Sequence, residues 1–312
     1  MSTVRPKARG EMDERIKFGL KRLVKLLISL GVFCFSYMCD TLRRLMGKPV
    51  PARCVILYYH AIPSGQRELF ARQMDTLVRW AKPIPADSRL VLRPAERYAA
   101  VTFDDAYESV LVVALPELRK RKIPATVFVI TGALGRSMGW EGYPEKVMTL
   151  DQLNQLPIDL ITIGSHTVTH PNLSLVSEDE ARTELCESRK KLEELLHRKI
   201  ALFSFPYGAF ETKMVEWCRE AGYERIFTTL PHLAFSNPQE FVTGRVPVEP
   251  DDRLLEFNLK LFGAYRWLPW AFSLKRKLFS NPMHRAKVGK TKAPNPGAAQ
   301  EAVRTRSSGR RI

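Results

Sequence analysis

The sequence lacks the marks of a disulfide-stabilised or cysteine-based metalloprotein. Its five cysteines, at positions 34, 39, 54, 186 and 218, show neither an even framework nor a metal-type spacing. The pattern indicates no cysteine zinc site, and it fits a reducing compartment without requiring one. No small-residue cleavage signal follows the apolar N-terminal segment, so we do not expect a removed signal peptide.

Acidic residues are also scarce, with 33 Asp and Glu against 49 Lys and Arg, which gives a net charge of +16. The excess lies in residues 1–48 and 275–312, whereas residues 49–274 are nearly neutral. A nucleic-acid-binding domain would carry its basic residues among aromatics on the folded core, so we expect no nucleic-acid partner. Basic flanks beside apolar segments instead favour contact with an anionic membrane surface.

The first apolar segment is shorter than a full membrane span. The uncharged stretch "LLISLGVFCFSYMC", residues 26–39, has 14 residues. As a helix it would cover only ~21 Å of a hydrocarbon core of ~30 Å. Adding Leu23, Val24 and a snorkelling Lys25 allows a single span. Most polar residues of segment 16–45 share one half of a helical wheel, which favours an interfacial helix in the membrane plane. A soluble helix packed on the domain is the third interpretation.

The charge distribution bears on which side of the membrane the protein occupies. A spanning helix would place the N-terminus in the cytoplasm and the folded core outside. It would also export the basic tail away from the anionic inner leaflet. We therefore expect an in-plane anchor on the cytoplasmic face through residues 16–45, with a single-pass protein as the alternative. The aromatic segment 254–279 is expected to pack its first half in the core, and its basic second half is a further candidate for membrane contact.

From about residue 53 the chain alternates strand-like and helix-like stretches. Six apolar runs are typical of strands: 54–60, 99–105, 125–130, 159–166, 202–208 and 225–229. Helix-like stretches lie between them at 109–122, 177–199 and 211–223, and Ser177 with Glu180 forms a capping box at the start of the second. The pattern predicts an α/β fold whose parallel sheet closes into a barrel. The chemistry of such barrels lies at the carboxyl ends of the strands.

Two neighbouring acids, Asp104 and Asp105, come at one of these strand ends. Side chains alternate between faces along a strand, so the two acids cannot share one task while the strand lasts. His166 and His170 are spaced i, i+4, which would place both imidazoles on one side of a helical turn. Two imidazoles and one carboxylate are a common ligand set for a divalent metal. One aspartate would then bind the metal, and the other would act as a base on the water that the metal activates.

The stretches "TFDD", "SHTVTH" and "FSFPYG", in this order and at these intervals, resemble the polysaccharide deacetylase family over roughly residues 53–250. The resemblance implies a distorted (β/α) barrel that removes acetyl groups from N-acetylated sugars with a divalent metal, often zinc. The first strand, "LYYHAI" (57–62), is similar to the tyrosine-histidine strand that opens many bacterial members.

The resemblance also implies a task for each matched residue. Asp104 would be the general base, and the metal ligands would be Asp105, His166 and His170. Pro206 and Tyr207 match the third motif, in which the backbone N–H of the tyrosine helps to hold the oxyanion.

The sequence departs from the family pattern at three points. Ala106 follows the paired aspartates, where glycine is usual. The third motif has no arginine to orient the base and resembles a Tyr-Pro-Tyr-Gly variant with Phe205 at its first tyrosine; "TGRVPVEP" (243–250) resembles the Arg-x-Pro strand of that variant. No late histidine has a Leu-x-His setting. We therefore expect His60, at the end of the first strand, to serve as the general acid, and a protonated Asp104 that returns its proton is the alternative.

The sequence thus predicts four segments: a basic and apolar membrane-associating helix (1–48), a deacetylase-like barrel (53–250), an aromatic and basic helical extension (251–284) and a disordered basic tail (285–312). The expected function is metal-dependent hydrolysis of the N-acetyl group of a sugar in a polysaccharide or lipid-linked glycan of the bacterial cell envelope. Hydrolysis of a small non-sugar C–N bond and glycan binding by an inactive barrel are the alternatives.

Overall fold

A parallel sheet that curls into a barrel forms the centre of the computed structural model, which describes residues 7–138 and 145–279. The strand order is β8-β7-β6-β5-β4-β3-β1-β9, with β2 paired to β3. The strands are β1 (Arg53–Tyr59), β2 (Lys82–Pro83), β3 (Arg97–Phe103), β4 (Ala125–Val129), β5 (Ile161–Ser165), β6 (Leu202–Ser204), β7 (Arg225–Thr228), β8 (Val242–Gly244) and β9 (Val246–Pro247).

The last two strands bring the edges of the sheet together. β8 pairs with β7 at one edge and β9 pairs with β1 at the other, yet a single residue, Arg245, separates them in the chain. The sheet must therefore curl until its edges nearly meet, which confirms the predicted (β/α) barrel. Arg245 sits at the seam where the barrel closes.

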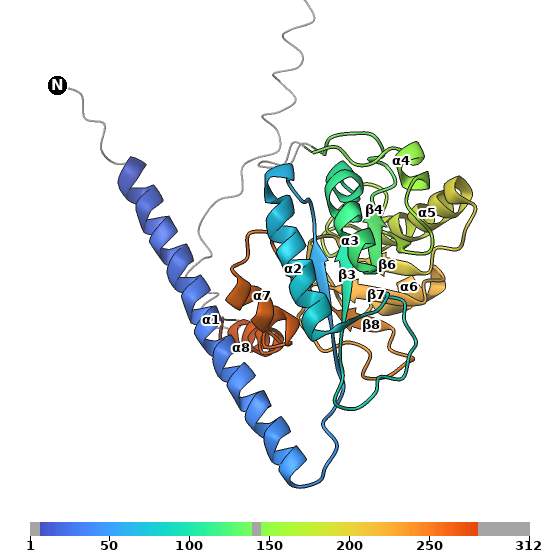
Figure 1. The fold of residues 1–312 in the computed structure, drawn as a ribbon. Coiled ribbons are helices and arrows are strands. Elements are labelled where there is room, and N and C mark those ends of the chain that lie inside the picture. The colour runs from blue at the N-terminus through green and yellow to red at the C-terminus, as the bar shows by residue number, and fades with distance from the viewer. Residues whose placement is uncertain (1–6, 139–144, 280–312) are drawn as a thin grey trace, which may run out of the picture. The chain divides into compact units, whose positions relative to one another are not determined.

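Helices and short helical turns connect and cover the strands. They are α1 (Lys7–Leu45), η1 (Ser64–Gln66), α2 (Arg67–Trp80), η2 (Val110–Ala114), α3 (Leu115–Arg121), α4 (Leu150–Asn154), α5 (Glu178–Leu196), η3 (Pro206–Gly208), α6 (Met214–Glu220), α7 (Leu254–Leu261) and α8 (Leu268–Phe279). Helix α2 packs beside α3, and α5 beside α6, on the outside of the sheet (Figure 1).

The alternation of β3 decides which of its side chains face the catalytic end of the barrel. Val101 and Phe103 are buried in the layer between the sheet and the helices. Ala100 belongs to the smaller cluster that fills the barrel interior. Because successive strand side chains point to opposite faces, Asp104, four residues after Ala100, continues the inward-facing set.

Helix α1 contacts α7, the residues that flank it and β1 along one narrow strip of its surface, which we call the docking seam. Its members recur every three or four residues, as one face of a helix requires: Arg22, Leu26, Ser29, Phe33, Ser36 and Asp40. Asp40 pairs with Arg53 of β1, and the Ser29 hydroxyl accepts a hydrogen bond from the Trp267 indole at 2.9 Å. Four of the six seam residues are therefore polar.

The structure corrects several sequence expectations. The predicted helical turn at His166–His170 is wrong, because the chain after Ser165 is a loop in which Thr167 and His170 have positive φ values of 69° and 62°. The strand expected at 202–208 ends at Ser204 and gives way to the η3 turn. At α5 the Ser177 side chain accepts from the backbone N–H of Glu180 at 3.2 Å, which is one of the two hydrogen bonds of the predicted capping box.

The C-terminal part has two helices. The expected core packing of the first half of 254–279 is confirmed, since Phe257, Leu261 and Tyr265 are buried in the main core. Compact units divide at Pro269, and the second begins at Trp270, within α8. The tail expected to be disordered, 285–312, lies outside the described residues.

Candidate active site

The predicted site residues converge on one cavity at the carboxyl ends of the barrel strands. The cavity has a volume of about 400 Å³ and is lined by Tyr58, His60, Asp104, Asp105, Tyr107, His166, His170, Phe205, Tyr207, Thr229 and Glu249. Six of the seven residues singled out from the sequence are in this lining. Pro206, the seventh, is buried directly before Tyr207. The cavity opens to solvent, because His60, Tyr207 and Glu249 are exposed.

Asp104 is held by Arg245, a residue to which the sequence analysis gave no function. The guanidinium is fully buried and grips both carboxylate oxygens, Nη1 to Oδ1 at 2.7 Å and Nη2 to Oδ2 at 2.8 Å. It also donates to the hydroxyls of Thr102 at 3.0 Å and Ser204 at 2.7 Å. Three aromatic rings lie 4.6, 5.2 and 5.8 Å from it, those of Tyr58, Phe128 and Phe227.

This pairing decides the ionisation of Asp104. Burial alone would raise its pKa, but the charge and hydrogen bonds of Arg245, together with the nearby His166 and His60, outweigh burial and hold the pKa of Asp104 well below its usual range. Asp104 is therefore a carboxylate at any working pH. Arg245, which lies between β8 and β9 where the barrel closes, thus takes the place of the arginine missing from the third motif, about 40 residues earlier in the chain.

Asp105 reaches the same cavity because the strand has ended. β3 stops at Phe103, and Asp105 has a positive φ of 67°, which breaks the alternation that would turn it outward. Its Oδ1 lies 3.5 Å from His166 Nε2 and 3.4 Å from His170 Nε2. Burial, and then the negative Asp104, raise the pKa of Asp105 to about 8. The two adjacent acids therefore have opposite electrostatic surroundings, as different tasks would require.

The histidines are arranged to present neutral nitrogens to Asp105. His166 Nδ1 lies 2.8 Å from the Ser204 carbonyl oxygen, so Nδ1 carries the proton and the Nε2 lone pair faces Asp105. Burial lowers the pKa of His166 to about 4. Burial and the adjacent His166 lower the pKa of His170 to about 3.

The loop between the histidines is fixed by Glu184 of α5, which the sequence analysis also missed. Its carboxylate accepts from the backbone N–H groups of Val168 and Thr169 at 2.7 and 3.0 Å and from the Thr169 hydroxyl at 2.7 Å. These bonds hold a loop with two strained residues in one conformation, so the two imidazoles converge without a helix.

The Asp105, His166 and His170 group fits a divalent metal ion. Their donor atoms lie within 4.8 Å of one another, and all three side chains are buried. Among the described residues, the buried Asp105 Oδ1 has no hydrogen-bond partner. Two ligands about 2.1 Å from a tetrahedral ion are ~3.4 Å apart, which agrees with the separations of Oδ1 from the imidazole nitrogens. A cation would satisfy the lone pairs that otherwise face one another.

Tyr207 lines the cavity beside His170. Its φ is 58°, its side chain is 65% exposed and its ring lies 4.7 Å from that of His170. Gly208, with φ +64°, must be glycine, because a Cβ there would collide with the Thr229 side chain. The turn thus brings the backbone of Pro206 and Tyr207 to the cavity next to the proposed metal ligands.

The chain is similar in sequence to known deacetylases. Residues 92–226 match the polysaccharide deacetylase family. A Bacillus subtilis protein named as a polysaccharide deacetylase, YxkH, is 27% identical over 226 residues, which cover 69% of this chain and 76% of YxkH. The poly-β-1,6-N-acetyl-D-glucosamine N-deacetylase of Staphylococcus aureus is 26% identical over 170 residues, 50% of this chain. This chain matches 56%, about half, of that enzyme's length.

Solved structures agree on the fold. IcaB from Ammonifex degensii superposes with a TM-score of 0.57 at 27% identity and covers 69% of this chain and 100% of its own. The Streptococcus pyogenes deacetylase PplD, solved with acetate, also has a TM-score of 0.57, at 23% identity over 68% of this chain and 99% of its own.

Proposed function

Since this chain belongs to the polysaccharide deacetylase family, and is thus a hydrolase of carbon–nitrogen bonds other than peptide bonds, we propose that it removes the acetyl group from an N-acetylated sugar in a polysaccharide or lipid-linked glycan. The observation that carries the proposal is the convergence of Asp105, His166 and His170 within 4.8 Å, next to an Asp104 that is held as a carboxylate. The Staphylococcus aureus relative, named as a poly-β-1,6-N-acetyl-D-glucosamine N-deacetylase, supports the substrate class.

In this proposal Asp105, His166 and His170 hold one divalent ion, with zinc as the first candidate because imidazole and carboxylate ligands suit it. When bound, the ion supplies Lewis-acid activation of water and polarises the acetyl carbonyl. Asp104 accepts a proton from the water that attacks the carbonyl carbon, and Arg245 keeps the carboxylate ionised and aimed at the cavity. The backbone N–H of Tyr207, after Pro206, donates to the oxygen that becomes negative in the transition state.

The C–N bond breaks when a proton reaches the sugar nitrogen, and the products are acetate and a free amine. We assign the donation of this proton to His60, which lines the cavity and is accessible from solvent. Asp104 is the alternative donor, since it has just received a proton. The two assignments differ in what a His60 variant does to substrates with good and poor leaving groups.

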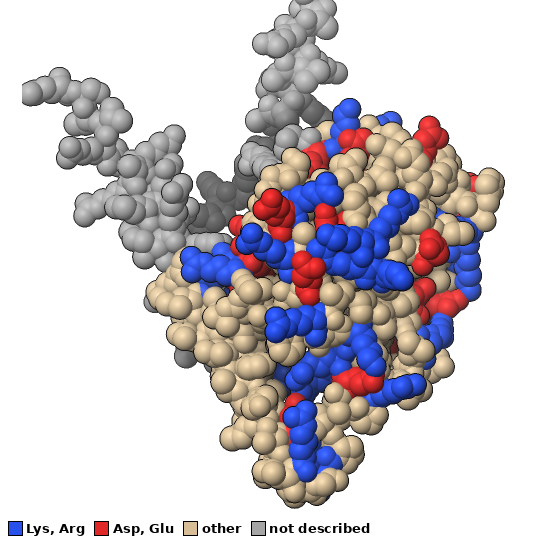
Figure 2. Space-filling model, viewed as in Figure 1, with Lys and Arg blue, Asp and Glu red and all other residues tan. Residues whose placement is uncertain are grey.

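The exposed surface of α1 supports a membrane location. Stretch Gly19–Leu45 is long and apolar enough to cross a membrane, with a mean hydropathy of 1.7, and only 17% of its most apolar part is buried. Four of the six residues of the docking seam, which face the rest of the protein, are polar, whereas the apolar Leu27, Phe35 and Leu42 are more than half exposed. Between Lys25 and Asp40 the helix carries no charged residue, whereas Figure 2 shows Lys and Arg spread over much of the remaining surface in view. A helix with this arrangement is suited to an apolar medium on its outer side.

The same docking favours a helix in the plane of the membrane. From Arg22 to Asp40 the seam runs ~27 Å, nearly the thickness of the hydrocarbon core. If that length crossed the bilayer, the charged barrel surface attached to it would be drawn into hydrocarbon. We therefore propose an in-plane anchor on residues 16–45, on the cytoplasmic face because of the basic C-terminal region, with α8 in 254–279 as a second contact.

A screen of N-acetylated glycans tests the proposed function. We expect the wild-type protein to release acetate and free amine in equal amounts. We expect Asp104→Asn to release neither product from any of the same substrates. Acetate release from a small non-sugar amide alone would establish the amidohydrolase alternative. Binding of a glycan without turnover, at full metal occupancy, would establish the inactive glycan-binding barrel.

A further inference from the structure

Glu249 is the carboxylate in the cavity lining that the mechanism leaves unused. It lies two residues beyond β9, is exposed and lines the cavity with His60 and Asp104. Its carboxylate makes no hydrogen bond or ion pair with any residue in the described ranges, 7–138 and 145–279. A carboxylate in an open cavity with no partner of its own is free to accept hydrogen bonds from a ligand.

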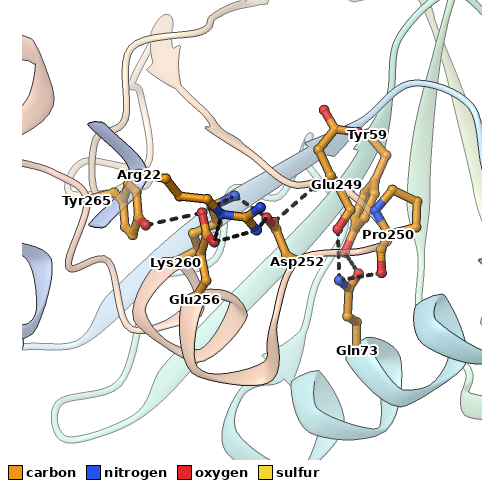
Figure 3. A network of polar contacts seen from close by, with 9 residues as sticks. All are labelled: Arg22, Tyr59, Gln73, Glu249, Pro250, Asp252, Glu256, Lys260 and Tyr265. Atoms are coloured by element: carbon orange, nitrogen blue, oxygen red, sulfur yellow. Dashed lines mark hydrogen bonds and ion pairs between the residues drawn. The ribbon is translucent and has the colours of Figure 1, made fainter. Parts of the chain in front are cut away.

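The backbone of Glu249, by contrast, is held on both sides. Its N–H donates to Asp252 Oδ2 at 3.0 Å, and its carbonyl accepts from the Asp252 N–H at 3.0 Å. The Gln73 side chain of α2 donates to the carbonyls of Glu249 and Pro250 at 2.9 and 3.1 Å (Figure 3). Gln73 is itself fixed by the Tyr59 hydroxyl at 2.9 Å. A fixed backbone that carries an unpaired side chain is the arrangement of a preorganised recognition residue.

Asp252 connects this turn to the anchor helix. Its Oδ2 lies 2.5 Å from the Lys260 ammonium, and its Oδ1 lies 3.4 Å from the guanidinium of Arg22 in α1. Arg22 Nε also donates to Glu256 at 2.7 Å (Figure 3). Without Arg22, the buried pair Asp252 and Glu256 would face the single positive charge of Lys260. An excess negative charge in such a buried cluster is unfavourable, so Arg22 helps to keep Asp252 on the turn.

The chemistry of the cavity indicates what Glu249 recognises. The metal ligands and the Asp104–Arg245 pair account for the acetamide end of the substrate, and neither includes Glu249. The ring that carries the acetamide has hydroxyl groups, which are donors, and an ionised carboxylate accepts from two neighbouring hydroxyls at once. Thr229 adds a hydroxyl to the lining of the same cavity.

We propose that Glu249 is a substrate-recognition residue that accepts hydrogen bonds from hydroxyl groups of the N-acetylated sugar ring, and that the anchor helix holds it in place through Arg22 and Asp252. The inference rests on the proposed deacetylase function, because it needs a sugar in the cavity. It makes α1 a positioning element of the active site as well as an anchor.

The first experiment compares two substrates of the full-length, metal-loaded protein. One is an N-acetylglucosamine oligomer, and the other is 4-nitrophenyl acetate, which has no sugar hydroxyls. For Glu249→Gln, we expect the ratio of kcat/KM for the sugar to that for the ester to fall about ten-fold, mainly through KM, as the loss of one charge-assisted hydrogen bond predicts. An unchanged ratio would overturn the assignment.

A binding measurement separates this inference from the proposed function. Calorimetric affinity for the oligomer is measured in the Asp104→Asn background, with and without Glu249→Gln. Weaker binding with Glu249→Gln supports the recognition assignment even if the wild-type protein releases no acetate, and equal affinities contradict it. Loss of acetate release alone counts only against the deacetylase activity.

The second experiment tests the link to α1. Arg22→Gln should lower the sugar-to-ester ratio about three-fold, Arg22→Lys should restore most of it, and Arg22→Gln should add nothing in the Glu249→Gln background. Ser29→Ala is the matched control, since it removes a docking bond to Trp267 that is separate from Asp252. An equal fall with Ser29→Ala, or an additive effect of Arg22→Gln on Glu249→Gln, would refute the positioning of Glu249 by Arg22.

Discussion

Replacement of Arg245 by Met tests how the barrel creates its proposed base. The change removes a fully buried guanidinium that makes two hydrogen bonds to Asp104, at 2.7 and 2.8 Å. Asp104 would be left buried and uncompensated beside Asp105. Breaking a buried ion pair on one side typically costs about 3–5 kcal/mol of unfolding free energy, so we expect Arg245→Met to be that much less stable at pH 7.

The dependence on pH follows from the sign of the shift. In the wild type the folded pKa of Asp104 lies below its usual range, so its contribution to stability is present above ~3.9, the ordinary value, and is lost only as pH falls through the folded pKa. In Arg245→Met burial raises the folded pKa above the ordinary value. The stability difference between the two proteins should therefore be largest at neutral pH and should shrink towards pH 4.

The assay combines denaturant unfolding with rate measurements at saturating metal. The acid limb of kcat/KM should move to higher pH in Arg245→Met, because the base must lose a proton that it now binds more tightly. The control is Arg225→Met, which removes another buried arginine. Its guanidinium donates to the carbonyls of Ala86 and Ser88, so its loss should lower stability without moving the acid limb.

A double-mutant cycle gives the sharpest check. The double variant Asp104→Asn with Arg245→Met lacks both charges. Its loss in free energy of unfolding should be about 2–3 kcal/mol smaller than the sum of the losses in the two single variants. Strictly additive losses, or an acid limb that stays in place in Arg245→Met, would refute the account of how Asp104 is kept ionised.

The remaining predictions concern the base, the acid, the metal and the membrane. Asp104→Asn should keep its metal in elemental analysis yet lose ~10²–10⁴-fold in turnover, and loss of the ion would reverse the assignments of the two aspartates. His60→Ala should lose far more rate on an N-acetyl sugar than on an activated acetyl ester, whose leaving group needs no proton; equal losses would return the acid function to Asp104. Because the pKa of Asp105 is raised to about 8, an ion displaces a proton at neutral pH, so metal affinity by competition with a chelator should rise with pH up to about 8, and a flat profile would exclude Asp105 as a ligand. Phe35→Glu, on the exposed face of α1, should reduce sedimentation with anionic vesicles at unchanged stability, whereas digestion of residues 49–274 by protease in intact spheroplasts would favour the spanning helix.

Much of the site could be predicted from the sequence because the carboxyl ends of the parallel strands all lie at one end of the barrel. Residues that follow a strand, such as His60, Asp104 and Pro206, are therefore brought together by the topology alone. Asp105 and the two histidines then indicate a divalent metal site, because one carboxylate and two imidazoles are a common ligand set for such an ion. The error at His166–His170 arose because i, i+4 spacing is typical of a helix, whereas this loop reaches the same result through positive φ angles and Glu184.

The residues that were missed act over long sequence distances or through the backbone. Arg245 lies in a stretch that the sequence did single out, but its partner Asp104 is 141 residues away, and only closure of the barrel brings them together. Glu249 lies in the same stretch, four residues after Arg245, but its sequence did not mark it, since its place depends on the hydrogen bonds of its backbone with Gln73 and Asp252. The docking seam of α1 was visible as a polar face, but its direction, towards the barrel, follows only from the partners in the structure.

The central claim is that Asp105, His166 and His170 bind an ion on which cleavage of a sugar acetamide depends. The most direct measurement is the release of acetate and free amine from an N-acetylglucosamine oligomer by chelated protein, by the same protein after addition of Zn²⁺, and by His166→Ala after the same addition. The account predicts equal amounts of acetate and amine only from the reconstituted wild type, with about one ion per chain there and none in His166→Ala. Equal turnover by the chelated protein, or full metal occupancy in His166→Ala with His170→Ala, would contradict it.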